Sequence, residues 1–202
     1  SSARLIPQAL IDIDTKDFEK LAQVETLTPL HPAQDYNDGR ISYGVKIKGE
    51  DYIVPSEGEM FSLAACSARG ILLIQQHLTT TGFSHEAVLD FFTDATIVNP
   101  QEVFTEITAY IRRHIFFPAD ETYDLVGVWI MGTYLFRAFR YYPYLHLNAE
   151  KGSGKTLLME LMSPISFNGM LLTQPAASTV LKLVEQNSAS LFIDEAESLS
   201  AY

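Results

Sequence analysis

The stretch Asn148–Leu161, NAEKGSGKTLLMEL, is the most informative part of the sequence about the fold. It contains A-x-x-x-x-G-K-T, which differs only at Ala149 from the pattern G-x-x-x-x-G-K-[ST] of loops that hold phosphate groups. In such loops backbone N–H groups, a lysine and a hydroxyl surround the phosphates. The first position lies farther from the phosphates, so we expect alanine to be tolerated there if its φ angle is negative.

The residues on either side of this loop support the interpretation, because the pattern is informative only between a strand and a helix. Residues 144–148 alternate in polarity and predict a short strand. Residues 156–162 are helix-forming and stop before Pro164, which predicts a helix. The alternative is a glycine-serine turn in front of a buried helix.

A second motif lies at residues 190–195, where the apolar run SLFID is followed by Glu195. Such a run is typical of a fully buried strand in a parallel sheet. Asp194 would then emerge beside the loop, where it can help to hold Mg²⁺, and Glu195 would orient or deprotonate water. The alternative is a strand that ends in a solvated acidic patch.

One more helix and strand fit between the two motifs. Residues 169–172 predict a strand, Thr173 is a candidate helix cap, and Pro175 suits the first turn of a helix that ends near Asn187. The order strand, helix, strand, helix, strand predicts a parallel sheet. We therefore expect an α/β fold, a partial parallel sheet of the P-loop type with flanking helices, preceded by a small α+β N-terminal domain.

The stretches TYLFRAFRYYPYLHLNAEKGSGKTLLMELM and LFIDEAESL resemble the Walker A and Walker B regions of AAA+ and helicase-like P-loop ATPases from phages, plasmids and mobile elements. The resemblance implies ATP and Mg²⁺ as cofactors, with Thr156 and Asp194 as metal ligands and Glu195 and Lys155 as catalytic residues. It also implies a homo-oligomeric ring that acts on nucleic acid. The implied nucleotide-binding residues are Glu150, Lys151, Gly152, Ser153, Gly154, Lys155, Thr156 and Leu157.

Three parts are expected along the chain: an accessory domain at 1–95, a helical collar at 96–140 and the ATPase core at 141–202. The first should contain a hairpin that turns near Gly49 and a helix at 84–92. The collar should contain a helix from Asn99, as N-cap, to Phe117, and a helix over 121–140. The core ends soon after Asp194, so we expect an N-terminal fragment without the sensor and arginine-finger residues, which hydrolyses ATP poorly by itself.

The net charge is −11, from 14 basic and 25 acidic residues, and it argues against a broad nucleic-acid-binding surface. A local basic channel remains possible, and the alternative is ordinary surface lysines and helix arginines. Its candidate residues are Lys46, Lys48, Arg112, Arg113, His114, Arg137 and Arg140.

Cysteine content and hydropathy bear on the compartment. Cys66 is the single cysteine, so an internal disulfide is impossible and a reducing, cytoplasmic location is expected. The most apolar run, Leu125–Phe136, is too short to span a bilayer, so no membrane partner is expected.

The sequence thus predicts an ATP-hydrolysing, helicase-like or translocase-like motor. Two alternatives stay open. One is a non-catalytic binding or assembly module with an incomplete nucleotide site, and the other is an AAA+ ATPase that remodels protein.

Overall fold

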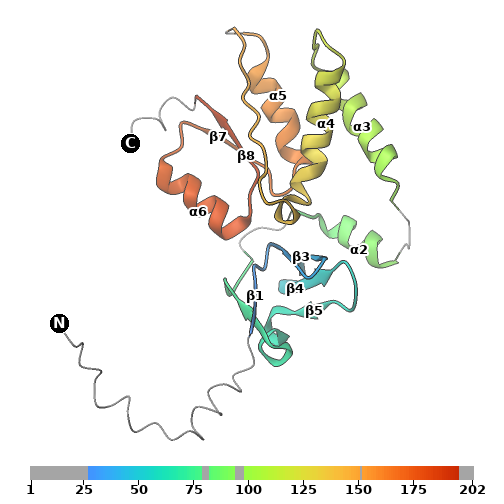
Figure 1. Ribbon diagram of the computed structural model, residues 1–202, viewed down its shortest axis with the longest axis vertical. Coiled ribbons are helices and arrows are strands. Elements are labelled where there is room, and N and C mark those ends of the chain that lie inside the picture. Colours follow the sequence, from blue (N-terminus) through green and yellow to red (C-terminus); the bar gives the residue numbers. More distant parts are fainter. Residues whose placement is uncertain (1–26, 79–81, 94–97, 151, 196–202) are drawn as a thin grey trace, which may run out of the picture.

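The computed structural model describes residues 27–78, 82–93, 98–150 and 152–195 (Figure 1). Its N-terminal part is an antiparallel sheet with the strand order β2 (Gln34–Asn37), β3 (Arg40–Ile47), β4 (Glu50–Pro55) and β5 (Phe61–Ser62). A separate parallel pair consists of β1 (Thr28–Leu30) and β6 (Ile71–Leu73). Between β5 and β6 lie two 3-10 helices, η2 (Leu63–Ala65) and η3 (Ser67–Arg69).

The predicted hairpin is formed by β3 and β4. Lys48 and Gly49 make its turn with φ angles of 52° and 88°, and two residues of positive φ match the twist of the flanking strands. Lys46 pairs with Asp51 across the hairpin, with 2.8 Å between Nζ and Oδ1. The candidate basic residue Lys46 therefore has an internal partner.

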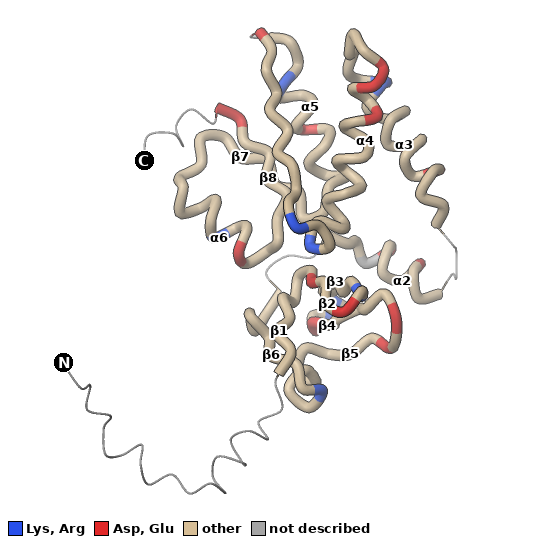
Figure 2. The backbone as a smooth tube through the Cα atoms, viewed as in Figure 1, with Lys and Arg blue, Asp and Glu red and all other residues tan. Residues whose placement is uncertain are grey.

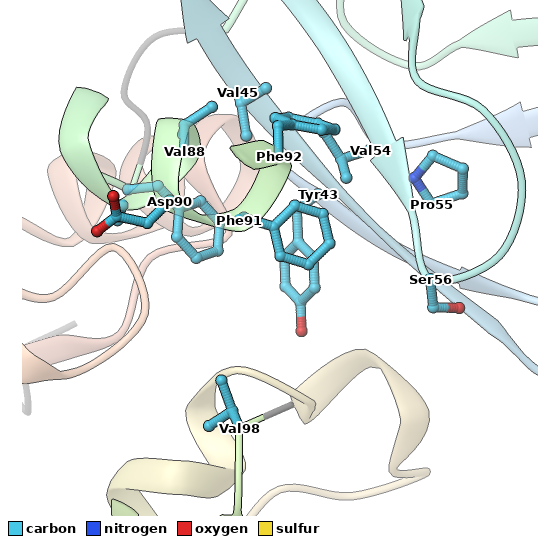
Figure 3. Close-up of a pocket in the computed structure, with 12 residues that line it drawn as sticks. Tyr43, Val45, Val54, Pro55, Ser56, Val88, Asp90, Phe91, Phe92 and Val98 are labelled. Carbon is cyan, nitrogen blue, oxygen red and sulfur yellow. The ribbon is translucent and has the colours of Figure 1, made fainter. Parts of the chain in front are cut away.

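Helix α2 (His85–Thr93) confirms the helix expected at 84–92 and packs against β3. Between α2 and the hairpin lies an apolar pocket of about 570 Å³ (Figure 3). Tyr43, Val45 and Val54 line it from the sheet, and Val88 and Phe92 line it from the helix. The pocket shares no lining residue with the phosphate-loop region.

Helices α3 (Pro100–Arg112) and α4 (Glu121–Thr133) pack against each other. Asn99 caps α3 as predicted, because its side chain accepts a hydrogen bond from the Gln101 N–H at 3.0 Å. Gly127 of α4 permits the close approach. A Cβ at that position would lie only 2.9 Å from the Thr108 side chain of α3.

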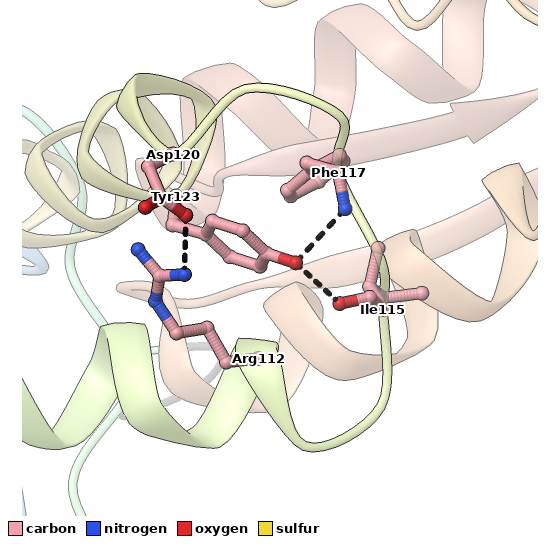
Figure 4. Close-up of polar contacts among 5 residues, drawn as sticks. All are labelled: Arg112, Ile115, Phe117, Asp120 and Tyr123. Atoms are coloured by element: carbon pink, nitrogen blue, oxygen red, sulfur yellow. Dashed lines mark hydrogen bonds and ion pairs between the residues drawn. The ribbon is translucent and has the colours of Figure 1, made fainter.

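Helix α3 ends at Arg112, and the predicted extension to Phe117 is wrong. Figure 4 shows the cause. The Tyr123 hydroxyl donates to the Ile115 carbonyl and accepts from the Phe117 N–H, both at 2.9 Å. These two backbone groups would bond within the helix if α3 continued, but here both bond to a side chain of α4. Arg112 also pairs with Asp120 at 2.7 Å, which closes the turn between the two helices.

Helix α4 likewise ends earlier than predicted, at Thr133 instead of residue 140, and a 3-10 turn, η4 (Phe136–Ala138), follows. The Thr133 hydroxyl donates to the Ile130 carbonyl at 2.6 Å and accepts from the Phe167 N–H at 2.9 Å. The Tyr134 carbonyl accepts from Gln34 at 2.6 Å and from the Tyr43 hydroxyl. Contacts with distant parts of the chain therefore end this helix.

The C-terminal part contains α5 (Lys155–Met162), the 3-10 helix η5 (Ser163–Ile165), β7 (Met170–Thr173), α6 (Ala177–Asn187) and β8 (Leu191–Asp194). The predicted helix after the loop and the two predicted strands are confirmed. β7 and β8 are parallel, with Thr173 beside Asp194. Thr173 belongs to β7 and does not cap α6, whose N-cap is Ala176.

The predicted strand at 144–148 is not formed, since residues 142–150 belong to no helix or strand. A pocket of about 340 Å³ is lined both by residues 144–147 and by residues 191–194 of β8. The segment is tied to α4 instead, where the Trp129 indole donates to the Pro143 carbonyl at 2.8 Å. It therefore has no strand partner among the described residues.

The main hydrophobic core joins α3, α4, α5 and β8. Its most buried members are Ile111 and Ile130, both fully inaccessible, and Met162 and Phe192 pack in the same cluster. This core fixes the N-terminus of α5 relative to the end of β8. None of the helices in the described ranges has the length and apolar content that crossing a membrane requires.

The connection between β1 and β2 contacts the C-terminal part through His31. Its Nε2–H donates to the Glu185 carbonyl at the end of α6 at 2.7 Å, and its Nδ1 accepts from the Ala33 N–H at 3.2 Å. This arrangement requires a neutral imidazole. Burial, the largest influence, and the nearby Arg137 lower the pKa of His31, whereas the Glu185 carbonyl and Asp35 raise it.

Candidate functional site

The loop before α5 has the backbone conformation that its sequence requires. Gly152 and Gly154 have φ angles of 82° and 92°, values that favour glycine. Ala149 is not among the described residues with positive φ, so the backbone condition that was set for alanine at the first position is met. The Ser153 N–H donates to the Glu150 carbonyl at 3.2 Å and tightens the loop.

Lys155 is the first residue of α5, and its ammonium group lies against the start of the loop. Nζ donates to the Glu150 carbonyl at 3.0 Å and also to the Ala149 carbonyl. The first N–H groups of α5 have no acceptor within the helix, and the helix dipole is positive at this end. The loop, Lys155 and the helix N-terminus together form a region suited to an anion.

Thr156 and Asp194 meet although 38 positions separate them in the sequence. The Thr156 hydroxyl donates to Asp194 Oδ2 at 2.8 Å. α5 supplies the hydroxyl from its first turn, and β8 supplies the carboxylate from its last residue. Mg²⁺ prefers oxygen ligands and commonly takes one or two from protein, with water and phosphate oxygens as the rest. A hydroxyl and a carboxylate in contact fit that requirement.

Glu195 follows Asp194 and is held by a residue that sequence reasoning missed. Gln174 donates from its side chain to Glu195 Oε2, and its backbone N–H donates to the Asp194 carbonyl at 3.3 Å. Gln174 and Glu195 have φ angles of 48° and 56°. Such values are uncommon outside glycine and are concentrated at functional sites. The position of Gln174, directly after β7, was the available signal, because parallel strands end at the same edge.

Packing behind the loop connects the site to the core. Leu158, Met159 and Met162 of α5 are buried. The Ile115 side chain would lie 3.8 Å from a Cβ on Gly154, so the loop after α3 supports the phosphate loop from behind. The hydrogen bonds of Tyr123 hold Ile115 in place.

The structure thus brings together the predicted residues Lys155, Thr156, Asp194 and Glu195 at the meeting point of α5 and β8. Leu157 is 43% exposed on α5, and Lys151 lies outside the described residues. Within the described ranges, no three His, Cys, Asp or Glu side chains are grouped as metal ligands. A cation here would therefore rely on Asp194, Thr156 and oxygens from its ligand.

Comparison of the chain with protein-family models, with curated proteins and with solved structures gave no match.

Proposed function

We propose that residues 148–195 bind Mg²⁺-ATP and that the protein is an ATP-hydrolysing, helicase-like or translocase-like motor acting on nucleic acid. One observation carries the nucleotide proposal: the Thr156 hydroxyl and Asp194 Oδ2 lie 2.8 Å apart at the N-terminus of α5. A glycine turn in front of an ordinary helix has no need of a carboxylate at this position. The convergence therefore favours a phosphate and metal site over the simple turn.

Each group has a role that follows from its chemistry. The loop N–H groups and Lys155 bind the phosphates, and Lys155 offsets the charge that develops on the transferred phosphoryl group. Thr156 and Asp194 hold the cation. Mg²⁺, when bound there, would neutralise part of the charge on the phosphates. Glu195 orients water and accepts its proton, and Gln174 fixes the position of the Glu195 carboxylate.

The experiment compares ATP affinity in Mg²⁺ and in EDTA for the wild-type chain and for Asp194→Asn. We expect Mg²⁺ to tighten binding to the wild type and to give Asp194→Asn little gain, because an amide is a poorer ligand than a carboxylate. Asp90→Asn, which alters an exposed residue of α2, serves as control. An equal Mg²⁺ effect in wild type and Asp194→Asn would rule out the proposed metal site.

A further inference from the structure

The segment from Leu135 to Tyr144, LFRAFRYYPY, presents aromatic rings to solvent. Tyr144 is 99% exposed, Tyr141 is 79% exposed and Phe139 is 52% exposed. Large apolar groups that are exposed next to one another are typical of surfaces that bind a partner. The segment, called the aromatic segment below, links α4 to the phosphate loop.

The backbone of the aromatic segment is held by Tyr142. Its ring packs against Trp129, Phe136 and Phe139, and its hydroxyl donates to the Trp129 carbonyl. Burial raises the pKa of Tyr142 to about 12, so the hydroxyl stays protonated as a donor. The Trp129 indole in turn donates to the Pro143 carbonyl at 2.8 Å. Tyr141 and Tyr144 are therefore displayed from a backbone that is anchored at the residues beside them.

The charge of this region is opposite to that of the whole chain. No acidic residue occurs between Asp124 and Glu150, although the chain has 25 acids against 14 bases. In Figure 2 the tube between α4 and α5 is blue near its start and shows no red until the loop before α5. Arg137 is used internally, because it donates to the Ser188 hydroxyl at 3.0 Å.

Arg140 is available to a ligand. Its guanidinium lies over the Tyr141 ring, 5.4 Å from the centroid, and it forms no ion pair with any described residue. Two other candidate basic residues differ in this respect. Lys46 pairs with Asp51, and Arg112 pairs with Asp120 and covers the Tyr123 ring. Positive charge and exposed aromatic rings thus coincide at the aromatic segment.

We propose that the aromatic segment binds single-stranded nucleic acid, with bases stacked on Tyr144 and Tyr141 and a phosphate paired with Arg140. Stacking on aromatic side chains accepts every base, and a nearby cation holds the backbone. A duplex is a poorer ligand, because its bases are already stacked on one another. Strand binding by itself does not depend on the proposed motor function, but its role in such a motor does. Tyr144 lies shortly before the phosphate loop, so strand binding can be coupled to the nucleotide.

Fluorescence anisotropy of a labelled oligothymidylate at low salt, with neither nucleotide nor Mg²⁺, tests the proposal on the 202-residue chain. Tyr144→Ala should weaken binding about tenfold, and Tyr144→Phe should keep most of the affinity because the ring remains. Arg140→Gln should reduce the slope of log affinity against log salt by about 0.7. Tyr36→Ala on β2, where Tyr36 is 40% exposed, and Arg69→Gln, which removes a guanidinium that also lies over an aromatic ring, are the matched controls.

Absence of binding by the wild type, or equal affinities for Tyr144→Ala and Tyr36→Ala, would overturn the proposal. Sedimentation of the same variants tests whether a second copy of the chain binds this surface instead. If Tyr144→Ala abolishes self-association and leaves oligonucleotide affinity unchanged, the surface belongs to a second copy and the proposal is wrong. A chain that binds the oligonucleotide but not Mg²⁺-ATP refutes the nucleotide proposal alone, and the reverse result refutes only the present one.

Discussion

Replacing Tyr123 with phenylalanine removes the one hydroxyl that ties α4 to residues 115–117. The ring is 4% exposed and its packing should survive, including the Arg112 guanidinium 3.9 Å from its centroid. Two hydrogen bonds of 2.9 Å are lost, one to the Ile115 carbonyl and one from the Phe117 N–H. A hydrogen bond contributes about 0.5–1.5 kcal/mol net, so Tyr123→Phe should lower the free energy of unfolding by about 2 kcal/mol.

Urea denaturation followed by circular dichroism measures this loss. The midpoint should fall and the slope m should stay constant, because the surface exposed on unfolding is nearly unchanged. Tyr36→Phe is the control, since Tyr36 is on the surface and its hydroxyl has no partner in the described ranges. A loss below about 0.5 kcal/mol for Tyr123→Phe would show that these two bonds do not fix the turn.

Three further predictions concern other parts of the chain. Asn99→Ala removes the N-cap of α3 and should cost about 1 kcal/mol in urea unfolding, whereas Asn99→Ser should retain most of the cap. The pKa of His31 in the folded chain lies below its unfolded value of 6.5, so the unfolded chain binds more protons. The free energy of unfolding should therefore decline as pH falls below about 6.5, and a His31→Gln variant with the same pH dependence would contradict this. Glu195→Gln should keep Mg²⁺-ATP affinity and slow any phosphate release by ~10²–10⁴-fold, and unchanged turnover would exclude Glu195 as the base.

Local signals predicted the elements that carry the candidate site, the start of α5 and the end of β8. Gly154, Lys155 and Thr156 act through consecutive backbone positions, so their spacing alone indicated the loop and the start of α5. Asp194 could be placed beside them because an apolar run predicts a buried strand and parallel strands deliver their last residues to a common edge. The hairpin turn at Gly49 and the Asn99 cap are local in the same sense.

Features decided by distant contacts could not be predicted in this way. α3 ends at Arg112 because Tyr123 occupies backbone groups of the next residues, and α4 ends at Thr133 because Phe167 and the N-terminal sheet bind its last turn. The alternation at 144–148 indicated a strand, yet strand formation also needs a neighbour. Gln174 was missed because it matters only through its hydrogen bond to the Glu195 side chain. Glu195 follows β8, whereas Gln174 follows β7, so the contact is not visible in the local sequence.

Calorimetric titration of the chain with ATP in excess Mg²⁺, beside Lys155→Ala at matched salt, measures whether residues 148–195 bind the nucleotide. Lys155 supplies a charge-assisted hydrogen bond to phosphate, and such bonds contribute about 1.5–3 kcal/mol. We therefore expect saturable binding by the wild type and affinity lower by about ten- to a hundredfold for Lys155→Ala. Equal affinities, or no binding by a folded wild-type chain, would contradict the assignment of residues 148–195 as a Mg²⁺-ATP site.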